Sequence, residues 1–505
     1  MLCALGNYEL MNRKDLISLC ICLHTSNLFE SFILPNMKKN FFITQLPYIV
    51  LGIGLLLGLY RLWYFVHSAI PFGYDPGIYK EYFSHYRSVT TSLDFSQLPH
   101  WIRYEPLLGI IAAFFNKLGV SFDRMLTRGI GLLNLIPGLL LFRYFKSKSK
   151  NLRWGVFAAV LYRTSIAQYQ VFWSGYFKQT LGVSFMLLVL IFWEKKKIWF
   201  QSVFFFLLVL LHKHTALYTW AILAVSTIVE WITTKKLPWK KILYRTIAGA
   251  VALLLYIPLR GRIMGEAVKA VGEGGGGDFI TPLTYIKYSW PIIVLSLCGL
   301  GLRIKERKWD VWMLWYGIGI LWIALSLVNY NRTLVFLDVF VVVFAAYFLF
   351  TIFQSRSSIW KYASFVLLLW WSIHYIVYVN NRAHPLISQE EFSSIQSLAT
   401  RTEPNAIIMT THRNYSPRII GRAQRTYINP GMSDSDAWTH EQRNQWRAGD
   451  GKLKCDMLNA TYAKLARPLY IRLGSQQFVE NLSGWTCFSL IKNGDTWILY
   501  KVVLQ

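Results

Sequence analysis

The sequence has few acidic residues and few charged residues of any kind. Only 26 of its 505 residues are Asp or Glu, against 53 Lys and Arg, and charged residues make up 16% of the chain. Hydrophobic residues make up 54%, with many long apolar runs, which excludes a soluble globular protein. The composition therefore predicts a polytopic α-helical membrane protein, because a helix pairs its own backbone polar groups inside the bilayer.

Two motifs of soluble enzymes are also absent. The six cysteines show no metal-ligand spacing, and only Cys455 and Cys487 share the C-terminal segment, where they form either one disulfide or two free thiols. The glycine run from Gly274 to Gly277 lacks the Lys-Ser/Thr pair of a phosphate-binding loop and follows no strand, so it is not a nucleotide loop. It is either a flexible loop that orders over substrate or a linker.

The excess positive charge follows a pattern of sidedness. The net charge is +27, and much of it falls in short loops between apolar runs, at 38–39, 146–150, 195–197, 235–241, 303–308 and 356–361. By the positive-inside rule these loops face the cytoplasm. No soluble segment carries a basic face interleaved with aromatics, so nucleic acid is not an expected partner, whereas the lipid bilayer is.

Apolar runs near the ~20 residues that cross a bilayer predict about eleven transmembrane helices. They lie at 47–67, 126–145, 154–172, 177–193, 198–212, 215–233, 243–259, 284–302, 311–328, 333–354 and 360–379. This order puts the N-terminus in the cytoplasm and the C-terminus outside. The apolar segment 105–119 is shorter, and its crossing would move the basic loop 146–150 outside, so we predict an interfacial helix there.

Three regions are expected along the chain. Residues 1–36 read as a poorly ordered extension, since Met37 resembles a natural start. Residues 37–385 form the transmembrane domain. Residues 386–505 form a small extracytoplasmic α/β domain, with helices predicted at 390–400 and 436–446 and strands at 406–410, 469–473 and 497–502.

Asp75 lies in the first outer loop and is a candidate general base. Pro76 biases it towards an extended backbone, while Gly73 and Gly77 allow another backbone or a ligand to approach closely. Near the membrane surface, partial desolvation would raise the basicity of its carboxylate. The alternative is an ordinary turn residue.

Glu105 opens the interfacial segment beside Pro106. A carboxylate at a helix N-terminus is stabilised by the helix dipole and the unpaired N–H groups, which explains Glu105 without any further role. The alternative is a second catalytic acid near Asp75.

Four basic side chains lie at the predicted outer ends of spans: Lys178, His212, His214 and Arg332. A cation there often extends only to lipid headgroups. If these side chains converge, however, they would bind a phosphate, for which Arg offers two parallel donors. Histidines two residues apart do not share a helix face, so a metal site built on them would need a broken helix.

This layout resembles the GT-C membrane glycosyltransferases, especially the protein O-mannosyltransferase and lipid A aminoarabinose transferase branch. In that family an acidic residue follows the first span, as Asp75 does here. A short helix then ends in a tight turn and an Arg opens the second span. The matching stretches here are Tyr104-Glu-Pro-Leu107, Lys117-Leu-Gly-Val-Ser121 and Arg128.

The resemblance implies transfer of a sugar from a polyprenyl-phosphate donor to a glycan, lipid or protein acceptor at the outer face of the cell membrane, with inversion. Asp75 would be the general base, and Lys178, His212, His214 and Arg332 would hold the donor phosphate. No cofactor is expected. Metal-dependent members carry paired acids in the first loop, whereas Pro76 follows Asp75 here, so a divalent metal has no sequence support.

Two other classes stay open. A polysaccharide polymerase or O-antigen-ligase-like enzyme would also act outside on lipid-linked sugars, but would depend more on outer arginines than on Asp75. A transporter or sensor would need no Asp75 at all. Few buried charges and no inverted repeat are apparent in the sequence, which disfavours a transporter.

Overall fold

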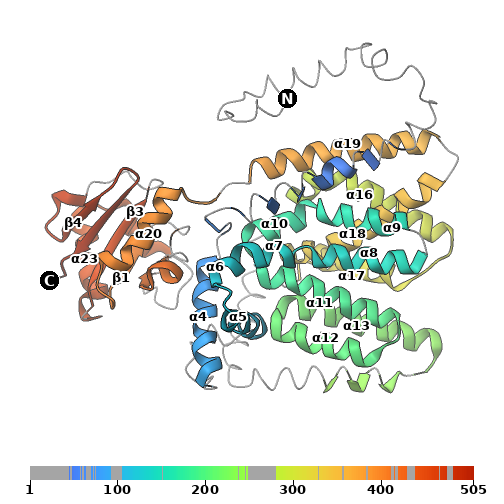
Figure 1. Cartoon of the computed structure of the whole chain (residues 1–505), viewed down its shortest axis with the longest axis horizontal. Helices are drawn as coiled ribbons and strands as arrows, with labels where there is room; N and C mark the ends of the chain where they lie inside the picture. The colour runs from blue at the N-terminus through green and yellow to red at the C-terminus, as the bar shows by residue number, and fades with distance from the viewer. Residues whose placement is uncertain are drawn as a thin grey trace, which may run out of the picture.

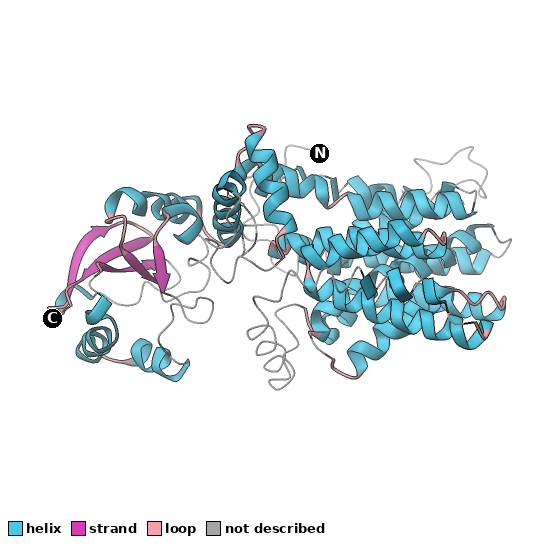
Figure 2. Ribbon diagram, turned by 90° about the horizontal axis from the view of Figure 1, so that it is seen from below, coloured by secondary structure: helices cyan, strands magenta, loops and turns pink. Residues whose placement is uncertain are grey.

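The computed structural model is a helical bundle with a small α/β domain at one end (Figures 1 and 2). It describes residues 76–92, 105–149, 152–236, 280–327, 329–354, 358–382, 385–410, 419–428, 440–465, 467–474 and 482–504, with shorter stretches within 45–73 and 238–247, and Tyr415 and Trp438. The predicted fold class, a polytopic helical protein with a C-terminal α/β domain, is confirmed. Asp75, the predicted extension 1–36, most of the span at 243–259 and the glycine run lie outside the described residues.

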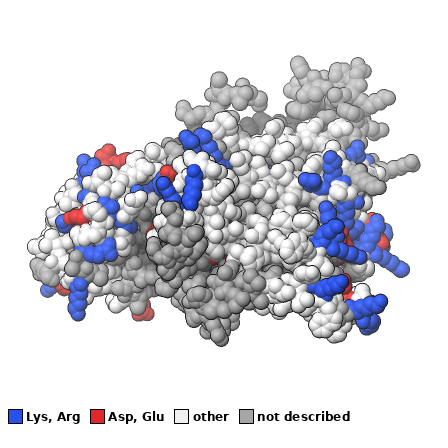
Figure 3. Space-filling model, turned by 60° about the horizontal axis from the view of Figure 1, so that its bottom comes forward, with Lys and Arg blue, Asp and Glu red and all other residues white. Residues whose placement is uncertain are grey.

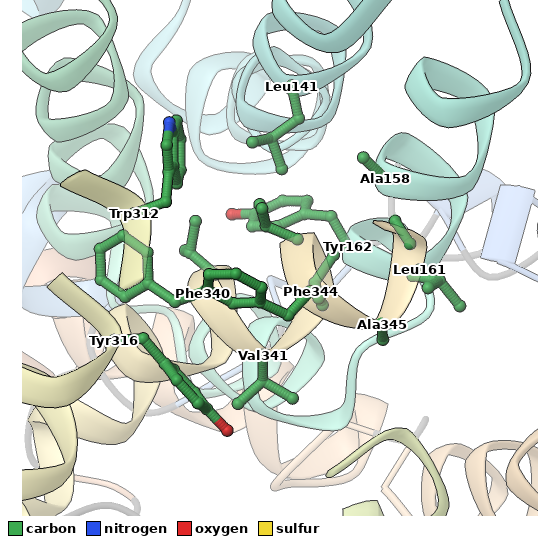
Figure 4. Packing of buried hydrophobic residues seen from close by; sticks show 14 of the residues in the cluster. Leu141, Ala158, Leu161, Tyr162, Trp312, Tyr316, Phe340, Val341, Phe344 and Ala345 are labelled. Carbon is green, nitrogen blue, oxygen red and sulfur yellow. The ribbon is translucent and has the colours of Figure 1, made fainter. Parts of the chain in front are cut away.

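The bundle is built around α18 (Tyr330–Gln354), whose residues are almost all buried. Figure 4 shows Phe340, Val341, Phe344 and Ala345 of this helix packed against residues of three neighbouring helices. Those neighbours are α8 (Ile136–Ser149), α9 (Leu152–Arg163) and α17 (Val311–Ala324). The other long helices are α11 (Phe177–Glu194), α12 (Ile198–Leu211), α13 (Lys213–Thr234), α16 (Pro282–Lys305) and α19 (Ser358–Asn380).

Within the described residues, six helical stretches are long and apolar enough to cross a membrane, and three apolar helices are shorter. One of the shorter helices is α5 (Leu107–Lys117), which lies within the segment predicted to be interfacial. Its buried face packs against α4 (Pro76–Ser92), while Phe114 and Phe115 remain exposed. This division into a packed face and an exposed apolar face suits a helix in the membrane interface.

The predicted span at 154–172 is not one continuous helix, because it breaks at Thr164 and Ser165 into α9 and α10 (Ile166–Ser174). The Ser165 hydroxyl caps α10 by accepting a hydrogen bond from the Gln168 backbone N–H, and it donates to Asp338 Oδ2 over 2.6 Å. The Gln168 side-chain amide donates to the same carboxylate over 3.0 Å. Asp338 lies in α18, so this partner could not be recognised from the local sequence.

Basic residues from three of the described loops gather at one end of the bundle. The ends of α8, α11 and α16 meet there, where Lys148 pairs with Glu194, and Arg303 pairs with Asp310. Figure 3 shows Lys and Arg at this end and on the α/β domain, with an almost uncharged belt between them. The structure thus separates the basic loops from the α/β domain, while the assignment of the basic end to the cytoplasm stays a prediction.

The α/β domain contains a five-stranded sheet in the order β2-β1-β3-β5-β4. Its strands are β1 (Ile407–Thr410), β2 (Thr426–Ile428), β3 (Leu469–Gly474), β4 (Phe488–Asn493) and β5 (Trp497–Val502). Strand β1 is parallel to β2 and β3, whereas β5 is antiparallel to β3 and β4. The strands β1, β3 and β5 correspond to the three strands predicted from the sequence. Sequence patterns missed β2, which is only three residues long, and β4, in which only Phe488 is buried.

Helices cover this sheet. They are α20 (Gln389–Arg401), α22 (His440–Ala448) and α23 (Gly451–Tyr462). The first two correspond to the predicted helices, and α23 was missed. Helix α20 begins with a capping box between Ser388 and Glu391.

The α/β domain contacts α4 through a short helical turn, Ile419–Ala423. Gly421 lies directly against the Gly77 backbone, and a Cβ at Gly421 would overlap the Gly77 carbonyl oxygen. Beside this contact, Arg422 Nη1 lies 2.6 Å from Asp123 Oδ1, and Lys80 Nζ lies 3.2 Å from Asp123 Oδ2. The domain therefore holds the start of α4, the helix that follows Asp75 in the chain.

Cys455 and Cys487 form a disulfide, with their Cα atoms 5.9 Å apart. The bond closes a loop across 32 positions, for which chain entropy predicts about 4 kcal/mol of stabilisation. We expect Cys455→Ser to lower the free energy of unfolding of the α/β domain by about this amount, measured by proteolysis in a urea series. Cys298→Ser is the control, since Cys298 is the free cysteine among the described residues. Equal urea midpoints for both variants would contradict the expectation.

Candidate active site

A cavity of about 200 Å³ lies among α4, α11, α18 and the start of α13. Of these elements, α4 lies at the end of the bundle nearer the α/β domain (Figure 1). Its lining residues come from distant parts of the chain: Ile78, Tyr79, Tyr82, Glu105, Tyr176, Lys178, Gln179, His212 and Arg332. Four of the six predicted site residues are thus in one place. His214 is adjacent, and Asp75 lies outside the described residues.

Glu105 is the acidic residue of this cavity, and it is buried. Its Oε2 accepts from Lys178 Nζ over 3.1 Å, and its Oε1 accepts from the Lys213 backbone N–H over 2.7 Å. Burial raises the pKa of Glu105, but Lys178 and the other neighbouring donors outweigh it and bring the pKa down to about 2. This environment suits a permanent counter-ion better than a proton acceptor.

The backbone at Glu105 is also held in an uncommon conformation. Its φ is +58°, in the left-handed region that few non-glycine residues adopt. The Tyr82 hydroxyl donates to the Glu105 carbonyl over 2.6 Å and accepts from the Gly109 N–H over 3.1 Å. Strained residues persist where the surroundings fix them, and such positions cluster at functional sites.

Lys178 lies in the first turn of α11, where Gly175 ends the preceding helix with a φ of +81°. Its Nζ lies 4.5 Å from the centre of the Tyr82 ring, and its backbone N–H donates to the Tyr79 hydroxyl over 3.4 Å. The ammonium is therefore positioned by an ion pair and an aromatic face together.

His212 lies between α12 and α13, in extended conformation, and caps α13. Its Nδ1 accepts from the Thr215 backbone N–H over 3.3 Å and lies 2.6 Å from the Thr215 hydroxyl. A ring nitrogen that accepts carries no proton, so the ring is neutral and Nε2 carries the hydrogen. His214 instead lies beside Asn329, with its Nδ1 3.0 Å from the Asn329 side-chain amide.

Arg332 lies in the first turn of α18. Its guanidinium lies 5.2 Å from the centre of the Tyr176 ring, and its carbonyl accepts from the Gln179 side-chain amide over 3.2 Å. The Nε atom of Arg332 is buried and has no hydrogen-bond partner among the residues that the structure describes. Buried polar groups are nearly always paired, so an unpaired N–H beside a cavity points to a ligand.

No sequence pattern pointed to the four other polar residues of the lining, Tyr79, Tyr82, Tyr176 and Gln179. Tyr79 and Tyr82 lie three positions apart in α4 and therefore on one helix face. That spacing indicates site residues only once α4 is known to lie beside Lys178 and Arg332. Tyr82 in particular organises the site, because it contacts both Glu105 and Lys178.

The arrangement is suited to an anion. Lys178, Arg332 and a neutral His212 all supply N–H donors, and the Glu105 carboxylate holds Lys178 in place. Charge-assisted hydrogen bonds of this kind are the usual means of binding a phosphate. Within the described part of the chain, no group of three His, Cys, Asp or Glu side chains is placed to hold a metal ion.

A family model matches residues 52–389, which cover more than half of the chain, and its description is the EpsG family. The chain belongs to the EpsG family. No curated protein matches this EpsG-family chain.

Solved structures show the same fold as this EpsG-family protein. ArnT from Cupriavidus metallidurans in the apo state is 10% identical with a TM-score of 0.53, over 90% of this chain and 97% of that one. ArnT bound to undecaprenyl phosphate is 11% identical with a TM-score of 0.52, over 90% and 98%. The archaeal oligosaccharyltransferase AglB from Archaeoglobus fulgidus, in complex with an inhibitory peptide and a dolichol-phosphate, is 14% identical with a TM-score of 0.52, over 86% and 70%. The fold is of the GT-C type.

Proposed function

We propose that this EpsG-family protein is a membrane glycosyltransferase that moves a sugar from a polyprenyl-phosphate carrier to an acceptor hydroxyl at the outer face, with inversion. The observation that carries the proposal is the cavity in which Lys178, His212 and Arg332 converge within a GT-C fold. In the similar structures, ArnT is bound to undecaprenyl phosphate and AglB to a dolichol-phosphate. Those complexes support a lipid phosphate as the ligand of the cavity.

In the proposed reaction, Asp75 accepts the proton of the acceptor hydroxyl. The hydroxyl oxygen attacks the anomeric carbon from the side opposite the phosphate, while the bond between that carbon and the phosphate oxygen breaks. The bonding electrons leave with the polyprenyl phosphate, whose growing negative charge Lys178 and Arg332 stabilise. The proposal invokes no metal ion, since the first loop carries a lone acid at Asp75.

The orientation of the protein is part of the proposal. The basic end, with Lys148 and Arg303, faces the cytoplasm, while the cavity and the α/β domain face outwards. Residues 386–505 then lie in an oxidising compartment, in agreement with the Cys455–Cys487 disulfide.

The test is sugar transfer in membranes that contain the full-length protein. A panel of radiolabelled polyprenyl-phosphate sugars is supplied beside the corresponding sugar nucleotides, and empty membranes serve as the control. Consumption of one lipid donor but of no sugar nucleotide, with one sugar added per acceptor, supports the proposal. A ladder of repeating products would favour the polymerase instead, and failure to consume any donor would favour a transporter or sensor.

The close packing around Gly73 gives a further prediction for this assay. Gly73 has a φ of +83°, and a Cβ there would lie 2.6 Å from the Ser174 carbonyl carbon. We expect Gly73→Ala to slow transfer by about 10-fold or more, because it displaces the loop that leads to Asp75. Gly119→Ala is the matched control, since Gly119 has a φ of +89° but open space around its Cβ position. Equal rates for the two variants would show that close packing at Gly73 does not matter.

A further inference from the structure

The α/β domain has no role in the reaction as proposed, and the described lining of the cavity contains no residue from it. The domain nevertheless contacts the first outer loop on both sides of Asp75 in the chain. Before Asp75, the side chain of Ile70 is buried in the hydrophobic cluster that contains Ile395 and Leu398 of α20 and Ile419. A side chain from the bundle's first outer loop therefore forms part of the core of the domain.

After Asp75, the contact is between two backbones. A Cβ at Gly421 would overlap the Gly77 carbonyl oxygen, so only a glycine at position 421 allows the helical turn to lie this close to the start of α4. Figure 1 shows α4 and α6 (Phe122–Arg124) at the end of the bundle that faces the α/β domain. The domain thus contacts the loop at Ile70 and again at Gly77.

An ion-pair network lies beside the contact between the two glycines. The side chain of Arg422 is almost fully buried, with its guanidinium 5.1 Å from the centre of the Phe392 ring and its Nη1 2.6 Å from Asp123 Oδ1. Lys80 of α4 approaches the other oxygen of Asp123, at 3.2 Å. Asp123 is half-exposed, so these pairs add little to overall stability. Their main effect is to join the domain, α4 and α6 in one arrangement.

We infer that the α/β domain is a positioning element of the transferase, in which Ile70, Gly421 and Arg422 hold the first outer loop so that Asp75 meets the acceptor hydroxyl. The inference rests on the proposed function, because it takes Asp75 as the general base. It assigns a role to residues that touch neither the donor nor the acceptor. These residues are positioning residues, not catalytic ones.

Chain geometry explains why such contacts matter for Asp75. Each residue spans at most about 3.5 Å, so a residue lies within about 7 Å of a residue two positions away. Asp75 is two positions from Gly73, which lies against Ser174 of α10, and two positions from Gly77, which lies against Gly421. A general base must come within about 3 Å of the proton that it accepts, and an error of about 1 Å can slow a reaction about 100-fold.

The test measures initial rates in membranes that contain the full-length protein, with the radiolabelled polyprenyl-phosphate sugar that the wild type consumes. We expect Arg422→Met and Gly421→Ala each to lower kcat by about 10-fold or more. The KM for the donor should change by less than about 2-fold, because the cations of the cavity are untouched. Arg422→Lys keeps the charge and should recover part of the lost rate.

A double variant tests whether Arg422 acts through Asp123. If one ion pair carries the effect, Arg422→Met combined with Asp123→Asn should lose little more activity than the more impaired single variant. Losses that multiply, to about 100-fold for two losses of about 10-fold, would overturn the role of this ion pair.

Hydrogen exchange of residues 68–82, measured on the purified full-length protein in lipid nanodiscs, gives a readout that does not depend on activity. Exchange should be faster in Arg422→Met and Gly421→Ala than in the wild type, because the loop is held less firmly. An intact Cys455–Cys487 disulfide reports that the domain of each variant has folded.

Two control variants lie in the same domain but away from the loop. Gly484→Ala is matched to Gly421→Ala, since a Cβ at Gly484 would meet open space. Lys501→Met is matched to Arg422→Met, since Lys501 pairs with Glu403 at 2.9 Å within the domain. Both controls should keep the transfer rate and the exchange rate of the wild type.

The outcomes separate this inference from the proposed function. Wild-type rates in Arg422→Met and Gly421→Ala, with Asp75→Asn inactive, overturn the inference alone. A higher KM for the acceptor at unchanged kcat also overturns it, because the domain would then bind the acceptor. If the wild type consumes no donor, the proposed function fails. In that case, unchanged exchange in both variants would still show that the domain does not hold the loop.

Discussion

Membranes that contain the Asp75→Asn protein are expected to transfer sugar at least about 1000-fold more slowly than membranes with equal amounts of the wild type. An amide has nearly the same shape as the carboxylate but cannot accept the acceptor proton. Donor binding should be almost unchanged, because the phosphate contacts proposed for Lys178 and Arg332 do not involve Asp75. The measurement is the initial rate of radiolabel transfer, together with donor binding to the same protein.

Glu81→Gln is the control for this experiment, since Glu81 is the next acid after Asp75 and does not line the cavity. It should retain transfer close to that of the wild type. If both variants lose activity, the first loop acts as a pair of acids and the case for a metal ion reopens. If Asp75→Asn keeps a tenth of the activity or more, Asp75 is not the general base and the polymerase hypothesis gains ground.

The sequence predicted the architecture well because its signals are local. Span length, loop charge and the periodicity of apolar residues each depend on neighbours in the chain, and the helical bundle and α/β domain follow from them. The break at Ser165 was missed because its cause, the Asp338 carboxylate, lies 173 positions away. Strand β4 was missed because its side chains are mostly exposed, which leaves no alternating pattern.

Most residues of the candidate site could be predicted from the sequence, but their convergence in one cavity could not. Lys178, His212 and Arg332 each looked unusual at the end of an apolar run, and the structure brings them to one cavity. Their convergence depends on packing between α11, α13 and α18, which no local pattern encodes. The function of Glu105 is the clearest case, because its two partners lie 73 and 108 positions further along the chain. From the sequence, Glu105 was interpreted as a helix cap or as a second catalytic acid near Asp75, and neither interpretation includes its pairing with Lys178.

On each side of Asp75 in the chain lies a glycine whose backbone is in close contact with another segment. The Gly73 backbone lies against Ser174, and the Gly77 backbone lies against Gly421 of the α/β domain. Both glycines were expected to permit close approach, and the structure supplies the two partners. The α/β domain is therefore placed to affect the proposed general base through backbone contact, without contributing a side chain to the cavity lining.

Replacing Arg332 by Gln is expected to lower the rate of transfer by about 100-fold. The glutamine keeps polar atoms of similar reach but loses the positive charge that stabilises the leaving phosphate. Because that charge grows as the bond to the sugar breaks, the interaction is stronger in the transition state than with the bound donor. The loss should therefore fall more on kcat than on KM, as measured by initial rates over a range of donor concentrations.

Arg382→Gln is the matched control for Arg332→Gln. Arg382 also lies over an aromatic ring, with its guanidinium 5.4 Å from the centre of the Trp173 ring, but it does not line the cavity. An equal loss of transfer rate in both variants would mean that arginines near this end of the bundle contribute only through contact with lipid or through folding. A rise in KM with unchanged kcat for Arg332→Gln would mean that Arg332 binds the donor without stabilising the leaving group. A fall in kcat confined to Arg332→Gln is the result that leaving-group stabilisation requires, because only that variant removes a charge from beside the breaking bond.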